Sequence, residues 1–433
     1  MWELIRANKR NSVILMLFMA VVLLLLGYLL GLAVAATMHG YAGYHSPHQA
    51  PVRQTYNTMY AGLWGLGIAS GVWLILAAVS FSSGDQILLA ASKAKRVTHD
   101  VHPQLFNIVE EMKIAAGLPA MPKVYIINDP APNAFATGRS PTSASVAVTA
   151  GLLAKLNRDE LQGVVAHEMS HILHRDILYV TIAGIMLGSI VLLSQVFLRG
   201  MFYSSLGSRR RYSGGGRGGG QAQLIFLLIA IVAAILAPIM AYLLYFALSR
   251  RREYLADAGA ARLTRYPEGL AGALEKIAND RSPQLAAANK ATAPMYIANP
   301  FKKKRGMKLS DLTSTHPPIS QRIKILRNMA HGASFRDYSD CYTKVTGGKT
   351  VMPAAVLTKE DVALRQASAQ AKKKQSLQEQ TRQVGDIMRR VNQFVFLTCV
   401  CGLKLKIPPN FKQKTVACPR CKRKLNLPAK QNV

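Results

Sequence analysis

The chain has 433 residues, of which 50% are hydrophobic, and it carries a formal net charge of +32. This length allows two or three structural units. So much hydrophobic surface together with so strong a positive charge is unusual for a soluble enzyme, and it fits a membrane protein with basic segments on one side. A nucleic-acid-binding protein is the alternative. We find no basic stripe interleaved with aromatic residues, so we rank that alternative below a membrane surface.

The cysteine content excludes a disulfide-rich secreted domain. The chain has five cysteines, and four of them form two close pairs near the C-terminus. No framework of many bridges is implied, so an oxidising compartment is not required.

The first apolar run covers residues 13–36 and follows three basic residues within the first ten positions. At about 1.5 Å per residue of helix it is long enough to cross a bilayer. The positive start and the Ala-Val-Ala triplet at 33–35 also fit a signal peptide. The apolar run is too long for an ordinary signal peptide, so we interpret it as an uncleaved signal anchor.

A second apolar span covers residues 61–81, and the basic residues Lys93, Lys95 and Arg96 follow it. The segment between the two spans has one arginine and no lysine. Because basic residues concentrate on the cytoplasmic side of a membrane, we predict that the N-terminus and the chain beyond the second span are cytoplasmic. We therefore expect a multi-pass protein of the bacterial inner membrane, with residues 1–81 as its anchor.

Residues 82–176 have a mixed pattern. We predict a helix over residues 100–116, which Gly117 and Pro119 end. We also predict strands at 124–127 and 145–149 and a turn or short edge strand at 133–138.

The next stretch holds an HExxH motif from His167 to His171. Asn157 and Glu160 form a capping-box pattern that predicts a helix start. On a helix the two histidines lie one turn apart on the same face, which lets two imidazoles bind one tetrahedral zinc ion. Glu168 is placed to take a proton from a zinc-bound water instead of binding the metal.

The plainer interpretation of this motif is a helix with two chance histidines and a surface glutamate. Composition alone would give HExxH in roughly one such chain in a hundred, so the match by itself is moderate evidence. His174 continues the row, but a third ligand from the same helix would reach the metal poorly. We therefore interpret His174 as structural.

Two further apolar spans, residues 177–198 and 224–248, follow the motif. Three arginines at 209–211 and a glycine-rich run separate them. These arginines violate the charge rule if the loop lies across the membrane, so the hairpin 177–248 either spans the bilayer or only dips into it. In both cases the chain returns to the side that holds His167.

An acidic motif follows three arginines at 250–252. Glu253 and Asp257 share one helix face. Two histidines on zinc need a third protein ligand, and Glu253 can be that ligand. Asp257 can orient one of the histidines from behind. The alternative is an ordinary charged pair at a membrane boundary.

The C-terminal region divides into a polar linker with some helix, residues 347–394, and a basic tail, residues 395–433. Two cysteine pairs in the tail predict a second, structural zinc site in a small ribbon, since so short a segment cannot fold on a core alone. The alternatives are exposed thiol pairs or a redox switch. The basic surface could dock on anionic lipid, ribosomal RNA or an acidic partner, and the sequence does not choose. The four cysteines are Cys399, Cys401, Cys418 and Cys421.

Five motifs in order resemble the M48 family of membrane zinc metallopeptidases, in particular its HtpX-like heat-shock proteases. They cover roughly residues 1–330 and are NAFATG at 133–138, HEMSH at 167–171, Asp176, EYLAD at 253–257, and THPP at 315–318 with Arg322. The arginine-rich loop and the cysteine-bearing tail depart from the family pattern.

The resemblance implies zinc on His167, His171 and Glu253, with Glu168 as general base. It implies that Asn133 lies at the substrate cleft. By the same resemblance His316 and Arg322 help to hold the substrate or its oxyanion, and Asp176 and Asp257 support the zinc ligands.

We therefore predict a mainly α membrane protein. It would combine a gluzincin-like protease domain at 82–346, built of helices and a small sheet, with about four transmembrane or membrane-dipping helices and a C-terminal zinc ribbon. Its predicted function is zinc-dependent cleavage of misfolded or damaged membrane proteins, with unfolded chains, the bilayer and other quality-control proteases as partners and no specific nucleic acid. An edge strand within 133–149 could bind an extended substrate. The alternative is an inactive membrane scaffold or a regulator that acts through the basic tail.

Overall fold

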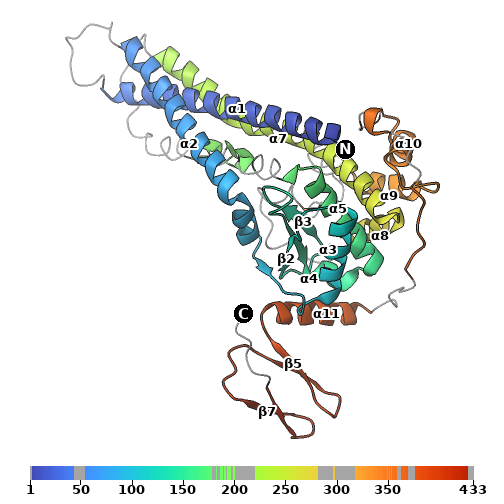
Figure 1. Cartoon of the computed structure of the whole chain (residues 1–433). Helices are drawn as coiled ribbons and strands as arrows, with labels where there is room; N and C mark the ends of the chain where they lie inside the picture. The colour runs from blue at the N-terminus through green and yellow to red at the C-terminus, as the bar shows by residue number, and fades with distance from the viewer. Residues whose placement is uncertain are drawn as a thin grey trace.

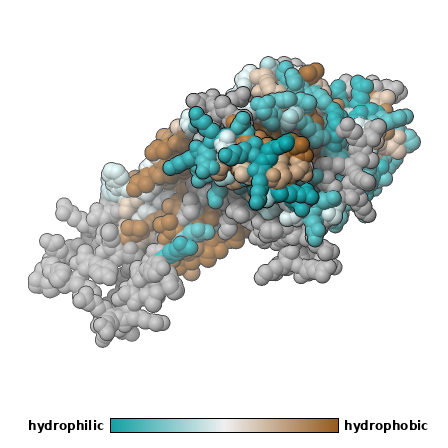
Figure 2. All heavy atoms as spheres, turned by 90° about the horizontal axis from the view of Figure 1, so that it is seen from below, coloured by the Kyte–Doolittle hydropathy of each residue, from teal (hydrophilic) through white to brown (hydrophobic). Residues whose placement is uncertain are grey.

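Long helices form one end of the molecule, and a body built of a small sheet and shorter helices forms the other (Figure 1). The computed structural model describes residues 2–42, 54–177, 220–280, 317–348, 362–368 and 376–427, with a few single residues and short stretches between them. Figure 2 shows hydrophobic side chains gathered over the long helices and mostly hydrophilic ones over the rest of that face.

Three long helices lie together: α1 (Trp2–Ala42), α2 (Gln54–Ala91) and α7 (Gly220–Thr264). Two of them contain segments long and apolar enough to cross a membrane, Ile5–Ala35 and Met59–Ala91. These segments match the first two predicted spans. The apolar part of α7, Leu228–Tyr242, is shorter. The predicted span 177–198 is only partly among the described residues, so the count of four membrane helices stays a prediction.

The long helices bury one side and expose an apolar side. Leu15, Met19 and Leu23 of α1 are buried, whereas Leu17 and Val21 of the same helix are about 60% exposed. Such apolar exposure on a long helix fits contact with lipid. Close approach of the helices depends on small residues, since a Cβ atom on the α1 glycine at 31 would lie 2.3 Å from the carbonyl oxygen of Ala61 in α2.

A four-stranded sheet lies in the body, with the strand order β1-β2-β4-β3. The strands are β1 (Ala94–Arg96), β2 (Lys123–Ile127), β3 (Ala134–Thr137) and β4 (Ser145–Thr149). β2 and β4 are parallel and form the centre, and β3 pairs antiparallel with β4 as an edge strand. The predicted strands at 124–127 and 145–149 are confirmed, and the segment 133–138 holds a true strand.

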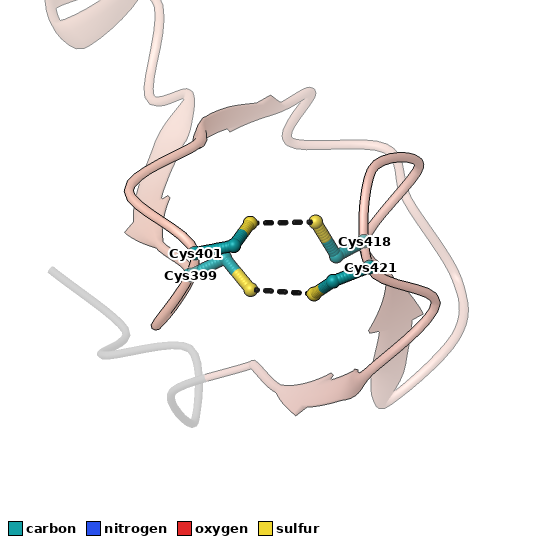
Figure 3. A group of neighbouring side chains, drawn as sticks. All are labelled: Cys399, Cys401, Cys418 and Cys421. Atoms are coloured by element: carbon teal, nitrogen blue, oxygen red, sulfur yellow. Dashed lines mark hydrogen bonds between the residues drawn. The ribbon is translucent and has the colours of Figure 1, made fainter.

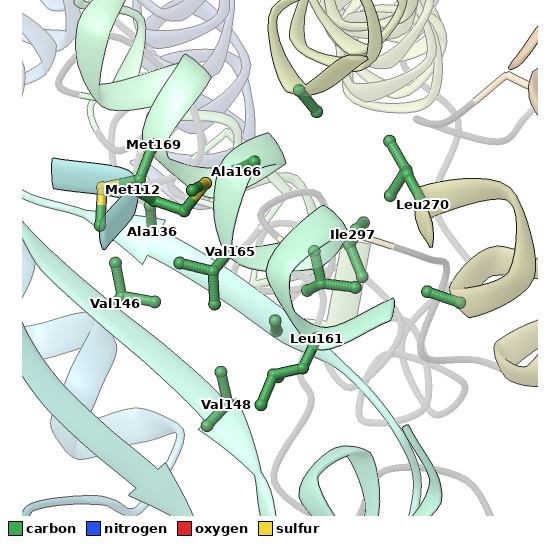
Figure 4. Packing of buried hydrophobic residues seen from close by; sticks show 14 of the residues in the cluster. Met112, Ala136, Val146, Val148, Leu161, Val165, Ala166, Met169, Leu270 and Ile297 are labelled. Atoms are coloured by element: carbon green, nitrogen blue, oxygen red, sulfur yellow. The ribbon is translucent and has the colours of Figure 1, made fainter. Parts of the chain in front are cut away.

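Helices cover the sheet and build the main core. They are α3 (Pro103–Ala115), α4 (Ala150–Lys155), α5 (Arg158–Leu173) and α8 (Pro267–Ala278). Figure 4 shows Val165 of α5 beside Val146 and Val148 of β4, with Met169 beside Met112. Nearly every side of α5 is buried, because the sheet lies on one side and α8 packs on another.

The chain continues through α9 (Ile319–Arg327), α10 (Phe335–Thr346), η5 (Ala354–Val356) and α11 (Leu377–Val391). Helix α11 lies within the stretch predicted to be a linker, yet it contacts α4 and buries Val384 and Val391 in the main core. Two small hairpins end the described chain: β5 (Val395–Thr398) with β6 (Lys404–Ile407), and β7 (Thr415–Ala417) with β8 (Lys424–Asn426).

Candidate metal centre and active site

Helix α5 begins at a complete capping box. The Asn157 side chain accepts a hydrogen bond from the Glu160 backbone N–H at 2.8 Å, and the Glu160 carboxylate accepts one from the Asn157 N–H at 2.7 Å. These bonds satisfy two N–H groups that a helix start leaves without partners. The helix register is therefore set from its first turn, which fixes the direction of the HExxH side chains.

Three potential zinc ligands converge inside the protein. The Nε2 atoms of His167 and His171 are 3.2 Å apart. The carboxylate oxygens of Glu253 lie 3.7 Å from His167 Nε2 and 3.6 Å from His171 Nε2. Ligand atoms at about 2.0–2.1 Å from a tetrahedral zinc ion lie about 3.3 Å from one another, so this set fits zinc. The HExxH helix supplies two of these ligands and α7 supplies the third.

Two carboxylates hold the opposite nitrogens of the histidines. Asp257 lies 3.0 Å from His167 Nδ1, and Asp176 lies 3.0 Å from His171 Nδ1. A carboxylate on Nδ1 fixes the tautomer and leaves Nε2 free to bind a metal. Asp176 reaches this position because Arg175, just after the helix, adopts the left-handed conformation with φ of 55°.

Arg322 lies against the two acidic residues that α7 contributes to this centre. It is fully buried, and its Nε and Nη2 atoms donate to the two oxygens of Asp257 at 2.8 and 2.7 Å. Its Nη1 donates to the carbonyl of Ile297 at 2.9 Å and lies 3.3 Å from Glu253. The guanidinium therefore positions both acidic residues of α7. Its expected contact with the substrate or oxyanion stays a prediction.

Glu168 follows His167 in sequence and is buried together with the charged residues of the metal centre. It is 1% exposed, and burial raises the pKa of its carboxyl group above the ordinary value. A carboxylate whose pKa is raised toward neutrality is suited to exchange a proton during catalysis. It does not belong to the set of three converging ligand atoms.

The remaining predicted residues have different outcomes. Asn133 is buried at the start of β3, where its side-chain oxygen accepts from the Ala134 N–H at 3.1 Å. His316 lies outside the described residues. His174 lies 3.2 Å from the Ser170 hydroxyl and away from the ligand set, and burial lowers its pKa to about 4. The structural interpretation of His174 is thus supported by its contacts.

Two features of the site were missed by sequence reasoning. A Cβ atom on Gly259 would lie 2.0 Å from the Ser170 hydroxyl, so only glycine allows α7 to approach the HExxH helix this closely. Its position two residues after Asp257 was the available signal. Arg365, from the predicted linker, donates to Asp159 at 2.8 Å and to Gln162 at 2.7 Å in the first turns of α5. No local pattern marks that contact.

The four tail cysteines form a second cluster (Figure 3). The sulfur atoms of Cys399 and Cys421 are 3.4 Å apart, and those of Cys401 and Cys418 are 3.6 Å apart. All four lie within 4.8 Å of one another. Zinc bonds to sulfur at about 2.3 Å place four tetrahedral sulfurs about 3.8 Å apart, so the cluster fits a Zn–S4 site. The Cys421 backbone N–H leads the contacts that lower the pKa of Cys418 to about 6, which favours the metal-binding thiolate.

Comparison with known proteins agrees with the protease-like geometry. A family model described as peptidase family M48 matches residues 100–330. A protease HtpX homolog of Dictyoglomus thermophilum is 42% identical over 76% of this chain and 94% of its own length. A protease HtpX homolog of Listeria monocytogenes serotype 4a is 40% identical over 76% of this chain and 100% of its own length. The crystal structure of S. mikatae Ste24p gives a TM-score of 0.36 at 20% identity, covering 61% of this chain and 58% of that one.

Proposed function

Because the chain belongs to peptidase family M48, we propose that His167, His171 and Glu253 hold its catalytic zinc and that Glu168 is the general base. The protein is a membrane zinc metallopeptidase. The observation that carries these residue roles is the convergence of the three ligand atoms within 4.8 Å of one another.

Each residue of the centre has a distinct task in peptide hydrolysis. Zinc held there would act as a Lewis acid that polarises the scissile carbonyl and lowers the pKa of the attacking water. Glu168 takes the proton from that water and later donates it to the leaving amine. Asp257 and Asp176 keep the Nδ1 atoms of the two histidines protonated, so that Nε2 stays available to the metal. Arg322 offsets part of the buried negative charge of Asp257 and Glu253.

We propose that the substrate binds as an added strand along β3. In an antiparallel strand, alternate residues direct their backbone groups away from the paired neighbour. The Asn133 carbonyl accepts a hydrogen bond from the Thr149 N–H in β4. The backbone N–H and C=O groups of Ala134 and Ala136 therefore point away from β4. The Ala134 carbonyl accepts from the Ile297 N–H, and the Ala136 backbone hydrogen-bonds to the Glu168 carboxylate, so the outward edge of β3 lies beside the candidate base. Recognition through backbone bonds favours extended, unfolded chains, including damaged membrane proteins.

For the topology we propose a multi-pass protein with the protease body on the cytoplasmic side. Its support is the two apolar segments in α1 and α2 and the exposed cations Lys93, Lys95 and Arg96 just beyond the second. Reporter fusions after Lys95 and at Val433 should both indicate a cytoplasmic position. A periplasmic signal from both would overturn this orientation.

For the tail we propose a structural zinc ion on Cys399, Cys401, Cys418 and Cys421. The fold of the tail supports it, because Cys399, Ile407 and Cys418 are its buried side chains among residues 395–427. So small a buried set supplies little hydrophobic stabilisation, and a metal would supply the rest.

The test of the catalytic assignment compares the wild-type protein with Glu168→Gln in cleavage of casein. The variant keeps the size of the side chain and removes its capacity to accept a proton. We expect it to retain the catalytic zinc and lose peptide cleavage. Substantial turnover by the purified variant would refute the base, and loss of the metal would show that Glu168 helps to hold it.

A further inference from the structure

The tail presents an acid-free cationic surface, here called the basic ribbon and defined as residues 395–427. This stretch contains eight lysines and arginines and no aspartate or glutamate. Lys406 pairs with Asp386 of α11 at 2.5 Å. The other seven are exposed, and they are Lys404, Lys412, Lys414, Arg420, Lys422, Arg423 and Lys424.

The basic ribbon is attached to the body by α11. Besides the pair with Asp386, the Arg390 guanidinium lies 5.3 Å from the ring centre of Phe396 in β5. At the end of α11 the Lys95 ammonium donates to the Asn392 side chain at 2.7 Å. Helix α11 itself packs into the main core. These contacts run from the body through α11 to the first hairpin.

This attachment directs the cations away from the membrane helices. Figure 1 shows the far ends of α1 and α2 at the upper left and the hairpins β5–β8 at the bottom, beyond α11. A lipid headgroup surface around the apolar segments of α1 and α2 is therefore the less suitable partner. A dissolved polyanion can reach all seven exposed cations.

We propose that the basic ribbon binds the phosphate backbone of single-stranded nucleic acid without sequence preference. Cations spread over both hairpins and the second cysteine knuckle match a chain of regularly repeated negative charges. Phe411 is half-buried in the loop that precedes Lys412 and Lys414, where its exposed part can stack on a base. This function adds to peptide hydrolysis and does not depend on it.

The test uses the full-length protein in nanodiscs of zwitterionic lipid. A fluorescein-labelled 20-nucleotide RNA and a DNA of the same sequence are titrated, and binding is followed by fluorescence anisotropy between 50 and 200 mM salt. A second, unrelated sequence tests specificity. We expect saturable binding of RNA and DNA with little dependence on sequence, and an affinity that falls steeply with salt.

A charge variant and a matched control decide where binding occurs. The variant changes Lys412, Lys414, Arg423 and Lys424 to Gln, and the control changes four exposed cations of the body, Lys123, Lys324, Arg336 and Lys344, to Gln. If each ribbon cation neutralises one phosphate, the slope of log affinity against log salt falls by about 3 in the variant. We expect at least a tenfold loss of affinity in the variant and little change in the control. Phe411→Ala should weaken binding roughly fivefold or more.

Three results would overturn the assignment. The first is that the wild-type protein binds neither RNA nor DNA, and the second is that the variant and the control lose affinity equally. The third is that the protein binds vesicles containing phosphatidylglycerol through the basic ribbon while it binds neither nucleic acid. The last result would assign the surface to lipid. Casein cleavage is measured on the same preparations, so failure of nucleic-acid binding is distinguished from failure of the protease.

Discussion

Arg322→Gln should be among the most destabilising single changes at the metal centre. It removes the two bonds to Asp257 and the contact with Glu253, and it leaves the fully buried Asp257 carboxylate without its cation. Loss of one partner from a buried charge pair costs about 3–5 kcal/mol. Lysine should not restore stability, because a single ammonium group cannot make the two parallel bonds of a guanidinium.

The same helix provides the control. Arg327 pairs with Glu268 and Glu275 at 3.0 and 2.9 Å, but its side chain is 41% exposed. An exposed pair contributes about 0–1 kcal/mol, so Arg327→Gln should scarcely change stability. Thermal unfolding in detergent and zinc content would be measured for both variants. If Arg322→Gln were as stable as Arg327→Gln and kept its zinc, the buried pair would not support the centre.

Three further outcomes follow from the two metal sites. Glu253→Ala should lower catalytic zinc occupancy, and Asp257→Ala should cost roughly 10–100-fold in affinity or activity; full zinc and activity in Glu253→Ala would place the third ligand elsewhere. Cys418→Ser should reduce bound zinc from two ions to one, as measured by atomic emission, while casein cleavage persists; unchanged metal content would refute the tail site. Because the folded tail lowers the pKa of Cys418 to about 6, protons compete with zinc for this thiolate below that value, and the apparent zinc affinity of the tail, measured against a competing chelator, should fall as pH is lowered through about 6. An affinity that stays constant between pH 7 and pH 5 would contradict that last expectation.

Local spacing made the HExxH centre predictable. The capping box at Asn157 and the four-residue separation of His167 and His171 are properties of one helix, so the sequence contains them directly. Glu253 could be predicted because a carboxylate is a common third ligand beside two histidines on zinc. The resemblance to the M48 family made that choice specific.

The parts that escaped prediction depend on distant contacts. The Arg322 guanidinium meets Asp257 across 65 residues, and no local pattern distinguishes an arginine that contacts substrate from one that neutralises a buried acid. Likewise, the polar composition of residues 347–394 predicts a linker, yet Val384 and Val391 pack in the core because α4 offers them an apolar surface.

The most direct measurement concerns the zinc ion that we propose His167, His171 and Glu253 hold. Zinc-edge X-ray absorption on the Cys418→Ser protein would isolate this ion, since that change removes the tail site. We predict nitrogen and oxygen ligands at about 2.0–2.1 Å, with imidazole scattering that decreases in His171→Ala. A spectrum dominated by sulfur at about 2.3 Å, or a protein without bound zinc, would contradict the account.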